Sequence, residues 1–197
     1  MMGQFTWRKM IGHLRVVLTH KWYVFQFMRK AGRPIQGLCH DLSKFSPVEF
    51  IESVCYFSGD RSPIDNIKDI KGYSRAWLHH RGRNYHHCEL WLEQVVEKGK
   101  EPIPLLMPKK YAIEMICDWM AAGKAYSKGQ GVVWTTQSPL EWYEAIGSRR
   151  RIHPAVDAFI REVYQQLASD GDLRRFNKAY LDQAYDQAVR AYWNRQS

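Results

Sequence analysis

The stretch "WRKMIGHLRVVLTHKWYVFQFMRK", residues 7–30, decides the fold class. Its apolar side chains recur at helical spacing, as at Ile11, Leu14 and Leu18, and the run ends before Gly32, a residue type that often terminates helices. Charged residues and histidines interrupt the run, which argues against both a secretory signal and a membrane span. We therefore predict one long helix over residues 7–30.

Sequence patterns in the remainder of the chain also predict helices. The segments "SPVE" (46–49) and "SPLE" (138–141) have the pattern of a capping box, in which Ser and Glu bind the free backbone groups of a first helical turn. The expected helices cover residues 7–30, 38–45, 47–57, 73–80, 85–98, 108–126, 154–168 and 173–193, with another from 138 and with loops at 58–69 and 127–137. No segment alternates over strand length and no linker divides the chain, so the sequence predicts a single all-α domain over residues 1–197.

Composition sets limits on location and partners. The chain has 197 residues, of which 45% are hydrophobic and 14% aromatic, as in a packed globular protein. Its four cysteines, Cys39, Cys55, Cys88 and Cys117, show no CxxC spacing, so we expect reduced thiols and a cytoplasmic location. The net charge of +9 suggests an anionic partner, although a basic surface without a partner would have the same charge. We expect no membrane partner.

The histidines are unevenly distributed, because seven of the eight lie in the first half of the chain: His13, His20, His40, His79, His80, His86 and His87. His13 and His20 are seven residues apart and so share one face of the predicted helix. In "GLCHDLSKFSP" (37–47), we expect a cation to fit between adjacent imidazole and carboxylate groups on one short helix. These ligand types suit zinc, iron, manganese or cobalt.

Two further segments supply polar groups. "HHRGRNYHH" (79–87) has two His-His pairs across a basic turn, so one imidazole of each pair would reach a second metal ion and the turn would face an anion; the alternative is a solvated polar loop. Asp118 interrupts the apolar helix "MICDWMAAGKA" (115–125). An unpaired buried carboxylate is costly, so Asp118 should meet a cation, either a basic side chain or a metal.

The order of these candidates along the chain resembles that of the HD superfamily of metal-dependent phosphohydrolases, over roughly residues 10–125. "HKWYV" (20–24) is similar to the helix of the first ligand, and "LCHDLSK" (38–44) is similar to the His-Asp doublet of two-metal branches such as the HD-GYP phosphodiesterases, although the GYP signature is absent. His13 in "HLRVV" is an alternative first ligand. The chain also looks like an uncharacterised family of small bacterial and phage proteins.

This resemblance implies an HD-domain-like helical bundle with residues 126–197 packed on it, and one or two divalent transition ions (Mn, Fe, Zn, Co or Ni). The implied metal ligands are His20, His40, Asp41, His80, His86, His87 and Asp118. Asp41 is the expected shared ligand and Lys44 the catalytic cation that faces the phosphate, and the implied substrate-binding residues are Lys44, Arg81, Arg83 and Asn84.

The implied activity is hydrolysis of a phosphomonoester or phosphodiester, a nucleotide or another small phosphorylated substrate, by metal-bound hydroxide. One alternative is an HD-fold di-iron oxygenase, which uses the same ligand types. Another is a basic module that binds nucleic acid or a partner through "SRRR" (148–151) and the C-terminal helix residues Arg174, Arg175, Lys178 and Arg190. We do not favour nucleic acid as the partner.

Overall fold

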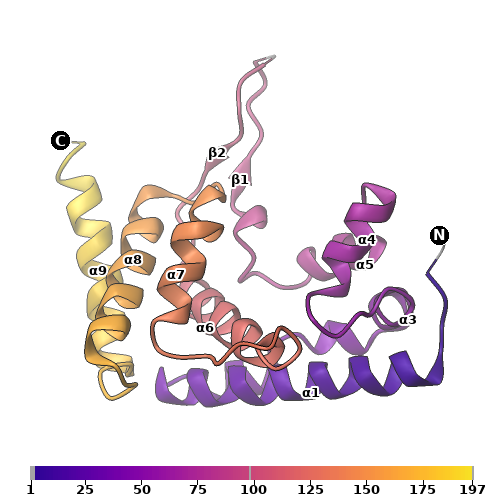
Figure 1. Ribbon diagram of the computed structural model, residues 1–197. Helices are drawn as coiled ribbons and strands as arrows, with labels where there is room; N and C mark the ends of the chain where they lie inside the picture. Colours follow the sequence, from indigo (N-terminus) through magenta and orange to yellow (C-terminus); the bar gives the residue numbers. More distant parts are fainter. Residues whose placement is uncertain (1–2, 98, 197) are drawn as a thin grey trace.

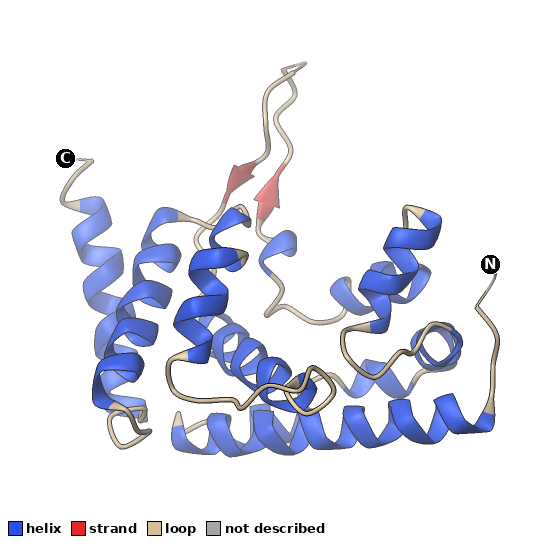
Figure 2. Ribbon diagram, viewed as in Figure 1, coloured by secondary structure: helices blue, strands red, loops and turns tan. Residues whose placement is uncertain are grey.

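Helices dominate the computed structural model, which describes residues 3–97 and 99–196 (Figures 1 and 2). The α-helices are α1 (Trp7–Lys30), α2 (Pro34–Cys39), α3 (Pro47–Cys55), α4 (Pro63–Lys71), α5 (Arg75–Arg81), α6 (Lys109–Tyr126), α7 (Ser138–Ala145), α8 (Pro154–Asp170) and α9 (Lys178–Trp193). Short 3-10 helices are η1 (Leu42–Phe45), η2 (Cys88–Leu90) and η3 (Gly147–Arg149). The predicted all-α fold class is confirmed.

One small hairpin interrupts the helices. Strands β1 (Leu92–Glu93) and β2 (Ile103–Pro104) pair in antiparallel fashion and lie at the base of a loop that projects from the body of the protein (Figure 1). This segment falls where the sequence predicted a helix over 85–98; the prediction is wrong over residues 85–97, and residue 98 lies outside the described residues. Among the described helices, none is long and apolar enough to cross a bilayer.

Helix α6 forms the centre of the fold. Its buried residues run without a break from Ala112 to Asp118, so the protein encloses this part of the helix on all sides, as expected for a central helix. It packs across α1, and α8 and α9 pack together beside it (Figure 1). The core joins Met28 of α1, Ile116 of α6 and Phe159 of α8, each with less than 1% of its surface exposed. Full burial of each such side chain stabilises the fold by about 1.5–3 kcal/mol.

Helices α3, α4 and α5 lie towards the N-terminal half of α1, whereas α2 lies beside its C-terminal half, with Gly37 next to Met28 (Figure 1). Helix α3 packs against α5, and α2 packs against α1. Because α1 contacts both this group and α6, it connects the segments that carry the predicted ligands.

Several predicted boundaries agree with the structure and several do not. Helix α1 has the predicted bounds, and α6 differs only in that Pro108 is its N-cap. The predicted loop 58–69 contains most of α4, whose start at Ser62-Pro63 has the same cap signal as "SPVE". The predicted helix 38–45 is split at His40 and Asp41 into α2 and η1, and residues 173–177 lie before α9 rather than within it.

Candidate metal centre

The structure brings all seven predicted ligands to one buried region. His20 comes from α1, His40 and Asp41 from the break between α2 and η1, His80 from α5, His86 and His87 from the turn after it, and Asp118 from α6. Six of these residues are buried and His87 is half-buried. Residues nearly 100 positions apart in the sequence therefore form one polar cluster inside an apolar fold.

The backbone at Asp41 is unusual. With φ 53° and ψ 33°, Asp41 is in the left-handed region, and no other non-glycine residue among those described has a positive φ. A non-glycine residue there costs about 1–2 kcal/mol, although Asp tolerates it better than most. The sequence predicted that His40 and Asp41 would project from one helix, and this is wrong: the helix ends, and the break turns both side chains into the cluster.

Three side chains lie around the carboxylate of Asp118 and form a group of four with it. Asp118 Oδ1 lies 3.1 Å from His20 Nε2 and 3.3 Å from His40 Nε2, while His40 Nε2 lies 3.1 Å from Asp41 Oδ2. One ligand atom from each of His20, His40, Asp41 and Asp118 lies within 4.8 Å of the others. We call these four residues group one.

A second group uses the other oxygen of the same aspartate. Asp41 Oδ1 lies 3.5 Å from His80 Nε2 and 3.6 Å from His86 Nε2, and His87 completes the set. We call Asp41, His80, His86 and His87 group two. Asp41 therefore belongs to both groups, with one oxygen directed to each.

These atoms fit a metal better than they fit one another. Among the described residues, seven buried side-chain nitrogen and oxygen atoms have no hydrogen-bond partner, and six of the seven belong to groups one and two. They are His20 Nε2, His40 Nε2, Asp41 Oδ1, Asp41 Oδ2, His86 Nε2 and His87 Nε2. Asp41 Oδ2 has the Lys44 ammonium group 2.7 Å away as an ion-pair partner, but the other atoms have only the contacts within the cluster described above. A buried polar atom without a hydrogen bond is costly, and metal coordination would satisfy these atoms.

The spacing of the atoms supports the same conclusion. Two ligand atoms about 2.1 Å from one ion lie about 3.0 Å apart at a right angle and about 3.4 Å apart at a tetrahedral angle. The five atom pairs described above are 3.1 to 3.6 Å apart, close to these values, and the remaining ligand atoms of each group lie within 4.8 Å of one another. The cluster could therefore hold a metal ion, and its mixture of imidazole and carboxylate suits transition metals.

Two glutamates behind the histidines were missed in the sequence. Glu114 Oε1 lies 2.9 Å from His40 Nδ1 and 3.5 Å from His86 Nδ1, and Glu49 Oε2 lies 2.8 Å from His80 Nδ1. A carboxylate on Nδ1 fixes the tautomer that leaves Nε2 free to bind a metal. Glu114 lies one helical turn before Asp118 and so on the same face of α6. This spacing was the feature of the sequence that could have placed Glu114 near the site.

Glu49 was predicted to cap helix α3. The first half of that capping box is present, since Ser46 accepts a hydrogen bond from the backbone N–H of Glu49. The carboxylate of Glu49, however, binds the imidazoles of His79 and His80. At "SPLE" the Ser138 hydroxyl accepts from Thr135 instead, and Gln137 is the N-cap, so that predicted capping box is wrong.

The protonation states of the ligand residues favour the binding of cations. Burial raises the pKa of Asp41, but His40 and Lys44 outweigh it and hold that pKa well below its usual range. Asp41 is therefore ionised. Burial and the nearby Lys44 lower the pKa of His20 to about 4, so its imidazole is neutral and keeps a lone pair for a metal.

Lys44 lies at the edge of the cluster. Its Nζ is 2.7 Å from Asp41 Oδ2, and about a quarter of its side chain is exposed. Burial lowers the pKa of Lys44, but the carboxylates of Asp41 and Asp118 outweigh it and raise that pKa, so the ammonium group stays charged. A permanent cation beside the two groups suits recognition of an anion.

Two histidines lie outside the ligand groups. His79 Nδ1 is 2.6 Å from Glu49 Oε1, and its side chain is 20% exposed. His13 is buried between the rings of Phe50 and Phe57 and belongs to neither group. Of the two alternatives for the first ligand, His20 lies in group one and His13 does not.

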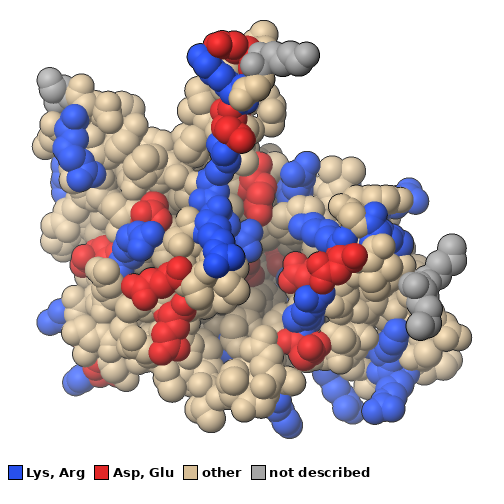
Figure 3. Space-filling view, turned by 45° about the horizontal axis from the view of Figure 1, so that its top comes forward, with Lys and Arg blue, Asp and Glu red and all other residues tan. Residues whose placement is uncertain are grey.

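Two adjoining cavities reach the cluster. A cavity of about 160 Å³ is lined by His20, Lys44 and His80 among others. A larger one of about 670 Å³ lies beside it, and both have His87 and Asp118 in their walls. Figure 3 shows a hollow in the middle of one face, with Lys and Arg side chains on both sides of it.

The side chains of Arg81, Arg83 and Asn84, at the end of α5 and in the turn after it, do not line these cavities. Arg83 is exposed and donates to the carbonyl of His79, and Arg81 lines neither cavity. Asn84 is bound to Ser43 and to the carbonyl of His80, so it holds the turn in place. Arg81, Arg83 and Asn84 therefore lie outside both cavity linings, and their predicted role in binding an anion stays a prediction. Basic side chains in the wall of the larger cavity come from Arg61, Lys68 and Arg150.

Comparison with known proteins gives one match. Residues 9–166 match the family model described as "Family of unknown function (DUF5662)". No curated protein matches the chain, and no solved structure matches it. The matched segment contains every residue of groups one and two.

Proposed function

This chain belongs to the DUF5662 family, whose function is unknown, and from its site we propose that it is a metal-dependent phosphohydrolase. The observation that carries this proposal is the division of Asp41 between two ligand groups, with Oδ2 facing His40 and Oδ1 facing His80 and His86. A carboxylate shared in this way is typical of sites for two metal ions. The same convergence supports the resemblance to the HD superfamily.

In this proposal group one would hold one divalent transition ion and group two a second. Bound there, such ions would lower the pKa of a bound water and polarise a phosphoryl oxygen. The imidazole of His20 and the carboxylate of Asp118 would hold their positions through the fold, since they come from α1 and α6, which pack together. Glu114 and Glu49 would keep His40 and His80 oriented.

Lys44 supplies the charge for phosphate recognition. Its ammonium group is charged, lines the smaller cavity and lies beside Asp41. It would bind a non-bridging phosphoryl oxygen and stabilise the negative charge that increases there as the ester bond breaks. The smaller cavity is the place for the phosphoryl group.

The larger cavity would hold the organic part of the substrate. Its walls include the indole rings of Trp77, Trp119, Trp134 and Trp142. Arg150 lies over the rings of Trp119 and Trp142 and pairs with Glu89. Aromatic and basic groups together suit a nucleotide or another small phosphoester with an apolar portion.

The alternative of a nucleic-acid module has less support. Arg150 pairs with Glu89, Arg151 with Glu101, and Arg174 with Asp172. Arg175 and Lys178 also lie within ion-pair distance of aspartates. Carboxylates thus neutralise much of the basic surface that nucleic acid would need.

The test is a screen of phosphomonoesters and phosphodiesters with protein loaded separately with Mn²⁺, Fe²⁺, Zn²⁺, Co²⁺ and Ni²⁺, beginning with p-nitrophenyl phosphate and its diester. We expect metal-dependent release of phosphate or alcohol, abolished by Asp41→Asn. Consumption of oxygen by the iron-loaded protein, without hydrolysis of any phosphoester, would replace this proposal with the oxygenase alternative.

A further inference from the structure

The N-terminal quarter of the chain has an extreme charge distribution. Residues 1–51 contain eight Lys and Arg residues but only two carboxylates, Asp41 and Glu49. Both are buried in or beside the metal centre, with 1% and 3% of their surface exposed. The described surface of residues 3–51 is therefore positively charged, with Arg8 and Arg15 among its exposed cations.

A stripe of exposed apolar side chains runs along α1. Trp7 is 70% exposed, Ile11 46%, Leu18 52% and Trp22 57%. At about 100° per residue these four positions fall within about 60° around the helix axis, so they form one line. The buried residues of α1, such as His20, project from the opposite side of the helix.

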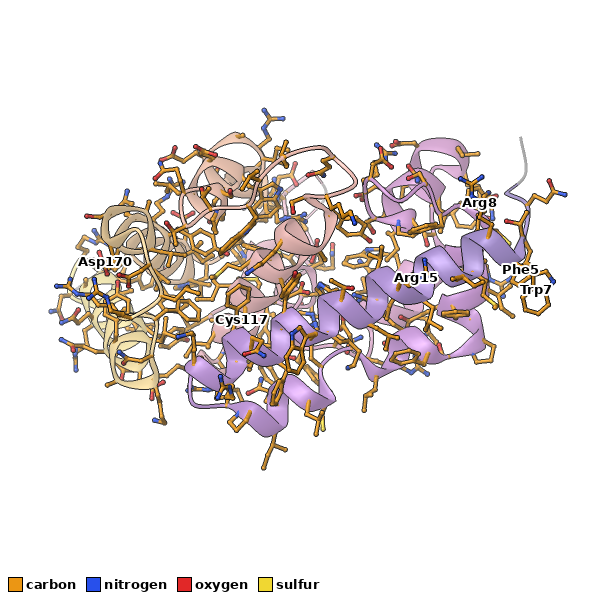
Figure 4. The ribbon with its side chains drawn as sticks, turned by 60° about the horizontal axis from the view of Figure 1, so that its bottom comes forward. Phe5, Trp7, Arg8, Arg15, Cys117 and Asp170 are labelled. Carbon is orange, nitrogen blue, oxygen red and sulfur yellow. The ribbon has the colours of Figure 1, made fainter. Side chains whose placement is uncertain are left out.

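The apolar surface continues onto neighbouring elements. Exposed apolar side chains follow on α2, η1 and α3: Ile35, Leu38, Leu42, Phe45, Val48 and Ile51. Helix α2 lies directly against α1, with Gly37 beside Met28. Figure 4 shows this face, with α1 running across it, α2 and α3 beside it, and Phe5 and Trp7 at one end.

We propose that this face, formed by the exposed side chains of α1, α2, η1 and α3, binds the surface of an anionic lipid bilayer. Aliphatic side chains would enter the boundary between headgroups and acyl chains, Trp7 and Trp22 suit that boundary, and the arginines would reach acidic headgroups. Our expectation of no membrane partner rested on the lack of a spanning segment, and surface binding needs none. The metal centre would face away from the bilayer, since His20 projects from the other side of α1.

The chemistry of the face disfavours other occupants. A second copy would bring two surfaces of the same charge together. Nucleic acid would gain little from Leu18, Ile35 or Leu38, because aliphatic groups donate no hydrogen bonds to phosphates. A bilayer with acidic headgroups matches both the apolar stripe and the positive charge.

The experiment is co-sedimentation of the full chain with vesicles of phosphatidylcholine and phosphatidylglycerol in equal parts, and with phosphatidylcholine alone. We expect binding to the anionic vesicles that weakens with added salt, and little binding to the neutral ones. Arg8→Gln and Arg15→Gln should each weaken binding about fivefold. The double variant Leu18→Ser/Trp22→Ser should weaken it roughly tenfold or more.

A matched control is Ile70→Ser/Leu78→Ser, since Ile70 on α4 and Leu78 on α5 are 56% and 62% exposed but lie outside the proposed face. This control should bind as the original chain does, and circular dichroism should show all variants folded. Failure to bind anionic vesicles at low salt would overturn the proposal. So would sedimentation showing a dimer that Leu18→Ser/Trp22→Ser dissociates while vesicle binding is absent. Neither outcome bears on phosphoester hydrolysis.

Discussion

Glu114 Oε1 lies 2.9 Å from Nδ1 of His40, so a carboxylate on α6 fixes the ring of a histidine in group one. Gln36 in turn binds the other oxygen of Glu114. Burial raises the pKa of Glu114, but His40 and His86 outweigh it and lower that pKa to about 2, so this carboxylate is ionised at neutral pH. A carboxylate that supports a ligand histidine raises the basicity of the ring and its affinity for a metal.

We predict that Glu114→Gln lowers metal affinity roughly 10–100-fold, because an amide supports the His40 imidazole less strongly than a carboxylate does. Competition with a chromophoric chelator measures this affinity directly. Glu144→Gln, an exposed change on α7, is the control and should leave affinity unchanged. Equal affinity in Glu114→Gln and the original chain would mean that Glu114 is only a structural partner of His40.

Periodicity and end signals made the long helices predictable. The repeat of apolar residues in α1, and Pro108 ahead of α6, are local properties of the sequence, and both helices lie where the sequence indicated. The break at Asp41 could not be foreseen, because its left-handed backbone depends on contacts with α1, α5 and α6 that local sequence does not encode. The helix predicted over residues 85–98 is wrong for a similar reason, since His86 and His87 turn inward to the cluster rather than continuing a helix.

The candidate site was predictable in its members but not in its arrangement. Residue type and order pointed to His20, Asp41 and Asp118, since buried polar groups in apolar segments need a partner. Which oxygen of Asp41 faces which histidine depends on the packing of four segments. Arg81 and Arg83 line neither cavity, because sequence proximity to histidines does not determine where a long side chain lies.

Lys44 is the clearest test of the proposed chemistry. We predict that Lys44→Met keeps the metal content but lowers turnover roughly 10²–10³-fold, because it removes one cation that stabilises developing charge on the phosphoryl group. Metal content is measured by elemental analysis and turnover by phosphate release. Lys128→Met, a change in an exposed loop residue, is the control. Full activity in Lys44→Met would show that Lys44 serves only to neutralise Asp41.

Metal removal should destabilise the protein, because the buried ligand atoms lose their partners. At a free metal concentration of 100 times Kd, binding adds about 2.7 kcal/mol to the free energy of unfolding. For a chain of this size that corresponds to a rise in Tm of about 5–10 °C. Differential scanning fluorimetry with chelator and then with excess Mn²⁺ measures the shift. The same Tm in both conditions, and in Asp118→Asn, would contradict a metal centre.

Two glycines should respond to alanine in opposite directions. A Cβ at Gly37 would lie 2.6 Å from the Met28 Cβ and 3.3 Å from the Phe25 Cα, so Gly37→Ala should force α2 from α1 and lower the free energy of unfolding by about 1–3 kcal/mol. A Cβ at Gly123 would meet Trp134 at 3.7 Å, an ordinary contact. Gly123→Ala should therefore raise the free energy of unfolding by about 0.5–1 kcal/mol. Urea denaturation measures both, and a shift in the same direction would refute the packing argument.

The number of bound ions tests the role of Asp41 as a ligand common to both groups. Elemental analysis of protein saturated with Mn²⁺ and then gel-filtered should give two ions per chain. His20→Gln removes a ligand of group one and His80→Gln a ligand of group two, so each variant should retain one ion, whereas Asp41→Asn should retain none because both groups depend on its oxygens. His13→Gln is the control and should retain two, since His13 belongs to neither group. One ion per chain under metal excess would reduce the centre to a single site, and loss of an ion in His13→Gln but not in His20→Gln would reassign the first ligand to His13.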